Sequence, residues 1–425
     1  MNVTHALKWQ SVEKISRIAI SFLSATLVLN FLMPENYSKI MGVVLLYNVS
    51  LNFLAKAFKA QFINSYREAH SVRVNIIILI VIMTLLINLS LYLFRGLLPD
   101  LYNIKVAALI FISSIFLPFS YLRYGFEYRY EFKELYVVEF TSFFILNILR
   151  VALVYFEIDT TLVIATYTLE AMAQTIITIV IMFRVRNTQN KILIQHNQVV
   201  IRSLIKTMKY MLPYLLIAII AMSYGKIDQF LILYYFEQVD SGQYFAAIRI
   251  YEFGAIIMMI FSNAMYPSLV RANSSHEVGE VHIKMYAMSI LSAFSLMFFV
   301  HLLAPAINFV FFNNGYEKSI GILKVLSIVY LFTFVGQAWS AHPLSQGKSK
   351  TILYSSIMTI FVIYICVFAA CKLGRIEDVP LALLIGNAIC IFFNFMLTGI
   401  NEEIRKIERA LNLLFVNLLK VFRNE

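Results

Sequence analysis

Apolar stretches of about 20 residues recur from one end of this 425-residue chain to the other. At 1.5 Å per residue, a helix of that length crosses the roughly 30 Å hydrocarbon core of a bilayer. The composition agrees, because 60% of the residues are hydrophobic and 14% are charged, against roughly 45–50% and 25% in soluble domains. The runs lack the period-two alternation of an outer-membrane barrel. The sequence therefore predicts an all-α polytopic membrane protein and excludes a soluble enzyme.

Apolar windows bounded by charges or by Pro, Gly and Asn define twelve predicted spans. They cover residues 15–33, 40–62, 74–94, 104–122, 135–156, 161–183, 210–235, 243–266, 284–303, 318–340, 352–371 and 379–399. The longest polar interval, 184–209, follows the sixth span and carries six Lys and Arg residues. We therefore expect two six-helix lobes, 1–183 and 210–399, joined by a basic linker at 184–209 and arranged around a central cavity.

The distribution of Lys and Arg predicts the orientation of the spans. If the N-terminus is cytoplasmic, the cytoplasmic segments hold 25 of the 35 Lys and Arg residues and the external segments hold 6. The positive-inside rule thus places both termini in the cytoplasm. The net charge of +11 is mainly this orientation signal facing anionic lipid, so we expect no nucleic-acid partner. Lys8, Lys14 and Arg17 precede an apolar run that no small-residue cleavage site follows, which favours a first transmembrane helix over a signal peptide.

The tail, residues 400–425, has apolar residues at spacings of three and four with charges between them. This pattern predicts an amphipathic helix on the cytoplasmic leaflet, and the alternative is a solvated face without a specific partner. The sequence shows no Gly-rich phosphate loop, Cys/His metal spacing or Ser/His/Asp grouping. His276 and His282 are expected in a polar loop, as interface residues and not as ligands. We expect no cofactor, no metal and no enzymatic activity.

Charged residues inside the spans are the strongest functional signal, because a charge facing lipid costs about 2.5–3.5 kcal/mol. With the 25 cytoplasmic and 6 external Lys and Arg residues set aside, four basic residues remain inside the spans, together with four acidic residues: Arg150, Lys226, Arg249, Lys324, Glu139, Glu170, Asp228 and Glu252. At 1.5 Å per residue, all except Glu139 lie roughly 10–15 Å below the external boundary. We therefore expect a water-accessible cavity in the outer half of the membrane. Glu139 lies nearer the cytoplasmic side and is expected to be structural.

The four cations predict an anionic ligand. Arg binds phosphate through a planar fork of donors and Lys supplies a compact charge, so a pyrophosphate group would suit Arg150, Lys226, Arg249 and Lys324. Snorkelling or pairing within the protein is the alternative for each.

The carboxylates in the same layer are candidates for ion coupling. A buried carboxylate is easier to protonate than an exposed one, so Glu170, Asp228 and Glu252 could bind H⁺ or Na⁺. Arg249 and Glu252 share a helix face at a spacing of three. A structural pair of Asp228 with Arg249 across a short hairpin stays open as an alternative.

Residues 223–269 carry an ordered pattern of a basic residue with Ile-Asp-Gln, a turn with Gly-x-Tyr, Ala-Ala-x-Arg, an acid and Pro-Ser-Leu. The matching residues are Lys226, Asp228, Gln229, Gly242, Tyr244, Ala246, Ala247, Arg249, Glu252, Pro267, Ser268 and Leu269. This stretch resembles the seventh and eighth helices of Wzx-type polysaccharide flippases. Residues 30–37 and 311–330 resemble the end of the first helix and the approach to the tenth helix of that family. Asn30 and Met33 depart from it, since Arg and Gly are common there.

The resemblance implies a member of the multidrug/oligosaccharidyl-lipid/polysaccharide (MOP) exporter superfamily. It implies that the chain moves an undecaprenyl-pyrophosphate-linked glycan across the bacterial inner membrane, with a polysaccharide polymerase and a chain-length regulator as candidate partners. Lipid II flippases of the superfamily have two further helices, which favours an O-antigen or related repeat unit here. The alternatives are a small-molecule exporter of the same superfamily and a membrane polymerase or ligase. The predicted external segments, of at most about 15 residues, count against such an enzyme.

Overall fold

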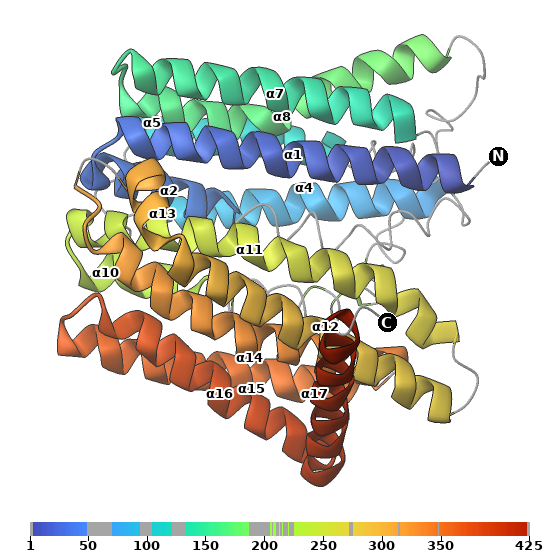
Figure 1. Ribbon diagram of the computed structural model, residues 1–425. Helices are drawn as coiled ribbons and strands as arrows, with labels where there is room; N and C mark the ends of the chain where they lie inside the picture. Colours follow the sequence, from blue (N-terminus) through green and yellow to red (C-terminus); the bar gives the residue numbers. More distant parts are fainter. Residues whose placement is uncertain are drawn as a thin grey trace. The chain divides into compact units, whose positions relative to one another are not determined.

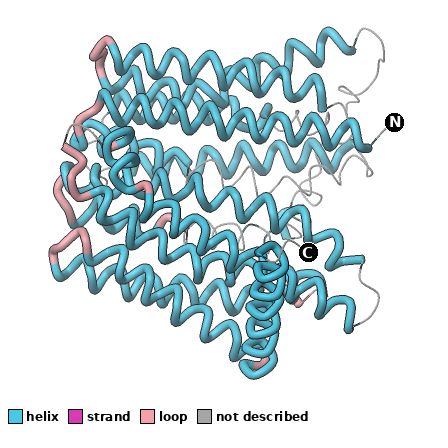
Figure 2. Tube along the Cα trace, viewed as in Figure 1, coloured by secondary structure: helices cyan, strands magenta, loops and turns pink. Residues whose placement is uncertain are grey.

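The computed structural model is helical throughout the residues that it describes, and it contains no strand among them (Figure 2). It describes residues 3–48, 70–93, 104–120, 132–186, 225–271, 275–312, 315–346 and 348–422, with scattered positions from 205 to 220. The second predicted span beyond residue 48 lies outside the described residues. So do most of the linker predicted at 184–209 and most of the seventh span before residue 225.

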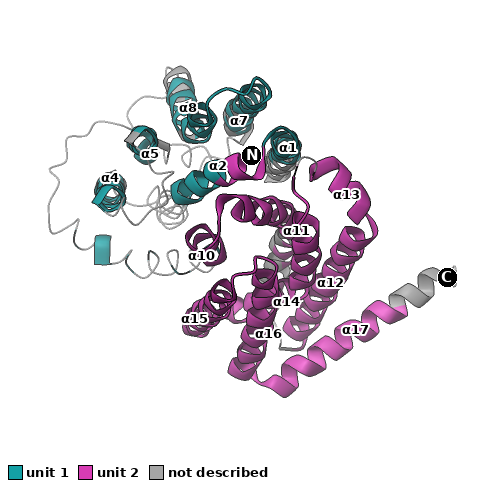
Figure 3. Ribbon diagram, turned by 90° about the vertical axis from the view of Figure 1, so that its left-hand side faces the viewer, with its two compact units in different colours: residues 1–32, 39–226 teal, residues 33–38, 227–425 magenta. Residues whose placement is uncertain are grey.

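The chain forms two compact units (Figure 3). Unit 1 comprises residues 1–32 and 39–226, and unit 2 comprises residues 33–38 and 227–425. The short segment 33–38, at the start of the second helix, thus belongs to a different unit from the helices on either side of it.

Unit 1 is a bundle of long helices lying side by side (Figure 1). Its helices are α1 (Val3–Phe31), α2 (Pro34–Tyr47) beyond residue 38, α4 (His70–Leu93), α5 (Ile104–Ser120), α7 (Phe132–Tyr155) and α8 (Thr160–Arg186). Helix α1 packs on α7, α7 on α8, α8 on α5 and α5 on α4. The turn before α8 ends at Asp159, whose Oδ1 accepts the backbone N–H of Thr161 at 3.0 Å. That bond caps α8 and holds the pKa of Asp159 below its ordinary value.

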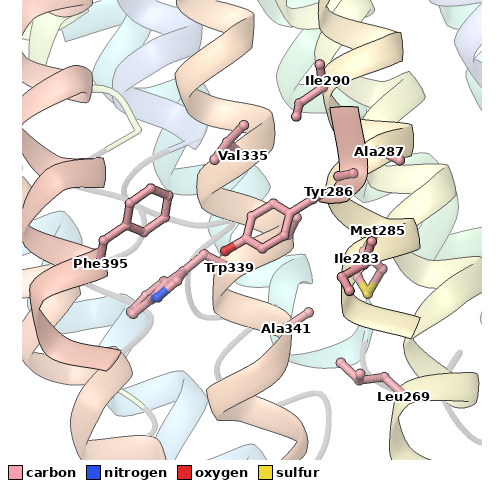
Figure 4. Close-up of a cluster of buried hydrophobic side chains, with 12 residues drawn as sticks. Leu269, Ile283, Met285, Tyr286, Ala287, Ile290, Val335, Trp339, Ala341 and Phe395 are labelled. Atoms are coloured by element: carbon pink, nitrogen blue, oxygen red, sulfur yellow. The ribbon is translucent and has the colours of Figure 1, made fainter. Parts of the chain in front are cut away.

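Unit 2 is built around α14. Its helices are α10 (Ile227–Tyr235), α11 (Gln238–Arg271), α12 (Ser275–Leu302), α13 (Ala304–Phe311), α14 (Ser319–Ser345), α15 (Ser349–Leu373), α16 (Asp378–Thr398) and α17 (Ile400–Phe422). Helix α14 packs on α11, α12 and α16. Its buried Trp339 lies among apolar side chains that include Tyr286 of α12 and Phe395 of α16 (Figure 4). Burial of such large side chains fixes the neighbours of α14 in place.

Helix α17 runs across the other helices of unit 2 (Figure 1) and packs on α12 and α16. The change of direction occurs at Gly399, whose φ of 105° is accessible to glycine at little cost. Ala410 and Ile407 of α17 contact the core, whereas Ile404 and Phe415 are exposed apolar side chains. The predicted amphipathic helix is therefore present, and it is attached to unit 2 by one face.

Six helices in the described part of the chain are long and apolar enough to cross a membrane. These candidate spans are Val74–Leu93, Thr160–Ile181, His276–Leu302, Ser319–Ser345, Lys350–Leu373 and Asp378–Thr398. Apolar side chains are exposed along them, such as Leu86 and Ile365, as expected where the solvent is lipid. The chain is a multi-pass membrane protein.

Three segments that resemble the flippase family meet at one end of unit 2, although they are far apart in the sequence. Tyr37, in the first segment, makes an edge-on contact with Tyr316, in the third, with ring centroids 6.3 Å apart. Both rings are buried. Gln243, in the second segment, accepts the backbone N–H of Ser319 at 3.2 Å. These contacts explain why residues 33–38 belong to unit 2.

Gly242 lies where α11 meets the start of α2. A Cβ atom at Gly242 would overlap the backbone of Pro34, including its carbonyl oxygen, and no flexible side chain is available to move aside. The absence of a side chain at Gly242 is therefore what allows α11 to contact the start of α2.

Replacing Gly242 with Ala is expected to lower the free energy of unfolding by about 1–3 kcal/mol, the usual cost of overpacking. Gly279→Ala is the matched control, because a Cβ at Gly279 meets nothing within 4 Å. It should instead stabilise α12 by about 0.5–1 kcal/mol. Thermal unfolding of the purified variants in detergent measures both. Equal midpoints for Gly242→Ala and the wild type would contradict the assigned contact.

Candidate functional site

The predicted site residues are divided between the two units. Unit 1 contains Arg150 and Glu170 and ends at Lys226, whereas unit 2 contains Asp228, Arg249, Glu252 and Lys324. The two sets are therefore described separately.

Arg150 is buried inside unit 1, with 5% of its surface exposed. Its Nε donates to Oγ1 of Thr166 at 3.1 Å and its Nη1 donates to Oδ1 of Asn147 at 2.9 Å. Its guanidinium carbon lies 3.4 Å from the ring centroid of Tyr167, a close cation–π contact. Nη2 is buried without a hydrogen-bond partner among the described residues. The Nη2 group of Arg150 thus has no hydrogen-bond partner among the described residues, while Nε and Nη1 fix the orientation of the side chain.

A second charged cluster of unit 1 centres on Arg17, which sequence analysis counted only as an orientation signal. Nη1 of Arg17 lies 2.9 Å from Oε2 of Glu139, and Nη2 lies 3.5 Å from Oε1 of Glu170. The three side chains come from α1, α7 and α8. Glu170 also accepts the amide of Gln174 at 3.3 Å. One cation therefore joins two carboxylates that were predicted to lie apart, Glu139 as structural and Glu170 as an ion-coupling candidate.

Helix α8 carries a polar stripe that connects these two clusters. Thr166, Glu170, Gln174 and Thr178 recur every four residues and so lie on one face. Thr166, Gln174 and Thr178 are buried, which satisfies the requirement that polar groups of a membrane helix face protein or water. The four-residue spacing was visible in the sequence and would have identified this face of α8.

Unit 2 holds Arg249 and Glu252 as the neighbouring pair that their spacing predicted. Nη1 of Arg249 lies 3.6 Å from Oε2 of Glu252, and the guanidinium lies 5.1 Å from the ring centroid of Phe253. Gln229 of α10 donates to Oε1 of Glu252 at 3.4 Å. The side chains of Arg249 and Glu252 are 29% and 34% exposed. The pair is therefore accessible from outside the unit, unlike Arg150.

Asp228 has a different environment on α10. It is buried, and its Oδ2 accepts the hydroxyl of the fully buried Tyr244 at 2.5 Å. Two residues beyond Arg249, Tyr251 stacks on Tyr330 of α14 with ring centroids 4.4 Å apart. Asp228 is thus held in the packed interior between α10 and α11.

Lys226 and Lys324 are half-buried. Lys226 immediately precedes α10, and Lys324 lies in the second turn of α14. Their positions leave both side chains partly accessible. Their proposed contact with a ligand stays a prediction.

The expected positions of two histidines were wrong. Helix α12 begins at Ser275, nine residues before the predicted span at 284, so that His276 and His282 lie in a helix and not in a polar loop. His282 is fully buried. The first turns of α12 carry exposed polar residues such as His276, Glu277 and Glu280, and their low hydropathy moved the predicted start of the span to residue 284.

The fold defines a class of protein, the multi-pass helical membrane proteins. No protein-family model matches the sequence, and no curated protein matches it. Among solved structures, the lipid II flippase MurJ in an inward closed conformation matches with a TM-score of 0.67 at 16% identity, over 96% of this chain and 92% of that chain. An inward-facing multidrug resistance MATE family transporter of the MOP superfamily matches with a TM-score of 0.63 at 14% identity, over 93% and 96%.

A MOP superfamily transporter from Pyrococcus furiosus matches with a TM-score of 0.54 at 13% identity, over 94% of this chain and 93% of that chain. The fold is that of the MOP superfamily transporters, as the sequence predicted. The structures that it resembles are transporters and flippases, not enzymes.

Proposed function

We propose that this protein is a flippase for an undecaprenyl-pyrophosphate-linked oligosaccharide, an O-antigen or related repeat unit. It moves this lipid from the cytoplasmic to the periplasmic leaflet of a bacterial inner membrane, and both of its termini are cytoplasmic. A polysaccharide polymerase and a chain-length regulator are its proposed partners. The observation that carries the proposal is the accessible Arg249–Glu252 pair within a fold shared with a lipid II flippase.

The proposed mechanism is alternating access of the two units. Arg249, Lys226 and Lys324 bind the pyrophosphate in a cavity while the polyprenyl tail stays in lipid. Arg150 is buried in unit 1, and its proposed contact with the pyrophosphate through Nη2 requires that this group become accessible during transport. Protonation or Na⁺ binding at Glu170, Asp228 or Glu252 changes the net charge of the cavity and couples transport to an ion gradient.

Export of small molecules is the second candidate function. It is favoured by the likeness to the multidrug resistance MATE transporter and by the carboxylates Glu252 and Asp228, which would attract organic cations. The two functions differ in substrate charge, so one preparation can test both.

The test uses the full-length protein in proteoliposomes containing an undecaprenyl-pyrophosphate oligosaccharide that carries a fluorescent group on its sugar. A membrane-impermeant quencher then reports how much lipid reaches the outer leaflet, with and without H⁺ and Na⁺ gradients. Empty liposomes and liposomes loaded with a cationic dye are the controls. We expect gradient-dependent movement of the lipid and no export of the dye. Dye export without lipid movement would replace the proposal with the second candidate.

A further inference from the structure

A cluster of potential metal ligands lies at the first turn of α17. It contains none of the charged residues proposed to bind substrate. It comprises His282 of α12, His342 of α14 and Glu403 of α17, whose ligand atoms all lie within 4.8 Å of one another. Three helices thus contribute one side chain each. The planes of the two imidazole rings are tilted by 31°, with centroids 4.8 Å apart.

His282 is prepared to act as a ligand. Its Nε2 lies 3.1 Å from the carbonyl oxygen of Ala338. Because a carbonyl oxygen only accepts hydrogen bonds, Nε2 carries the proton and Nδ1 carries the lone pair. That Nδ1 is buried without a hydrogen-bond partner among the described residues, and the whole side chain has no exposed surface. Metal-binding histidines typically use one nitrogen for a backbone carbonyl in this way and the other for the metal.

Glu403 is equally fixed. It is fully buried, its Oε2 accepts the hydroxyl of Tyr286 at 2.7 Å and its Oε1 accepts Nζ of Lys406 at 2.9 Å. Each carboxylate oxygen keeps a second lone pair. These hydrogen bonds orient the carboxylate as the outer partners of a metal ligand do.

A single lysine, Lys406, lies beside two carboxylates at this cluster. Lys406 also lies 2.7 Å from the carboxylate of Glu402. One lysine thus contacts the carboxylates of both Glu402 and Glu403.

An ion can reach the cluster from the side of His342. That residue is half-buried, and its Nε2 contacts the amide nitrogen of Gln346 at 2.8 Å. Gln346 is exposed at the end of α14, so it can yield its place to an ion without disturbing the core.

We propose that His282, His342 and Glu403 bind one divalent transition-metal ion of the Zn²⁺ type. Two imidazoles and a carboxylate are a common zinc ligand set, which leaves a fourth position for water. In a tetrahedral site the ligand atoms lie about 3.3–3.6 Å apart, so binding draws the three side chains together by about 1 Å. The ion fastens α17 to α12 and α14.

The test measures Zn²⁺ binding by isothermal titration calorimetry to the full-length protein, purified in detergent and freed of metal with a chelator. We expect one ion per chain, a higher midpoint of thermal unfolding with Zn²⁺, and visible absorption of a tetrahedral complex with Co²⁺. His282→Gln and His342→Gln should each weaken binding by at least about 100-fold. His276→Gln is the matched control, because His276 is exposed on the same helix as His282.

If His282→Gln does not fold, the half-buried His342 decides the outcome, because its replacement leaves the interior intact. The proposal is overturned if the folded wild type binds no Zn²⁺ or Co²⁺. It is also overturned if His342→Gln binds as tightly as His276→Gln. None of these measurements requires substrate, so their outcome does not depend on the proposed flippase activity.

Discussion

Replacing Arg249 with Ala is expected to lower the initial rate of lipid-linked oligosaccharide transport by about 10- to 100-fold at subsaturating substrate. A hydrogen bond to a charged group contributes about 1.5–3 kcal/mol, and each 1.4 kcal/mol corresponds to a tenfold change. Arg249 is chosen because it is partly exposed and its guanidinium lies 3.6 Å from the carboxylate of Glu252. Arg249→Lys should retain an intermediate rate, since it keeps the charge and loses the planar fork.

A double variant separates substrate binding from an indirect effect of the neighbouring carboxylate. Removal of Arg249 leaves Glu252 with less positive charge beside it, and that carboxylate alone would repel an anionic substrate. Arg249→Ala combined with Glu252→Gln removes the repulsion. The combined variant should remain at least tenfold slower than Glu252→Gln alone. Full recovery would show that Arg249 only neutralises Glu252.

The matched control is Arg375→Ala, which removes an exposed arginine from the turn between α15 and α16. It should transport at the wild-type rate. Each variant is compared at equal protein content in the fluorescent-lipid assay in proteoliposomes. Wild-type transport by Arg249→Ala would remove this residue from the proposed site.

Replacing Arg17 with Ala is expected to destabilise unit 1 by about 3–5 kcal/mol, the usual effect of removing one partner from a buried ionic group. Two carboxylates depend on this cation, Glu139 at 2.9 Å and Glu170 at 3.5 Å. Their side chains are only 10% and 20% exposed, so water cannot fully replace the guanidinium. The midpoint of thermal unfolding in detergent should fall by about 5–10 °C.

Neutralising the carboxylates should reverse the loss. The triple variant Arg17→Ala, Glu139→Gln, Glu170→Gln is expected to regain at least half of the lost stability, because no uncompensated charge remains. Lys105→Ala, which removes an exposed cation near the start of α5, is the control and should leave the midpoint unchanged. An Arg17→Ala protein as stable as that control would show that the cluster contributes nothing to stability.

The helices were largely predictable, because the signal for a membrane-spanning helix lies in continuous local sequence. The spans predicted at 74–94 and 379–399 end within a few residues of α4 and α16. The start of α12 was misplaced because its first turns carry exposed polar residues, which lower the local hydropathy. Hydropathy reports the contrast between lipid and water, so it does not detect the polar end of a longer helix.

The pairing of side chains was predictable only within one helix. Arg249 and Glu252 follow from a spacing of three residues. The partners of Arg17 do not, because they depend on the rotation of α1 and α7 about their axes. A residue counted as an orientation signal therefore proved to hold two acidic residues.

The sequence by itself determined that this chain is an all-α membrane protein with charged groups inside its spans, because the cost of polar groups in lipid is local and additive. It also contained the three segments that resemble the flippase family. Only the tertiary structure decided that Pro34, Gly242 and Tyr316 lie at one junction, and that His282, His342 and Glu403 form one cluster. Such groupings arise from packing between helices distant in sequence, where the shapes of both surfaces act together.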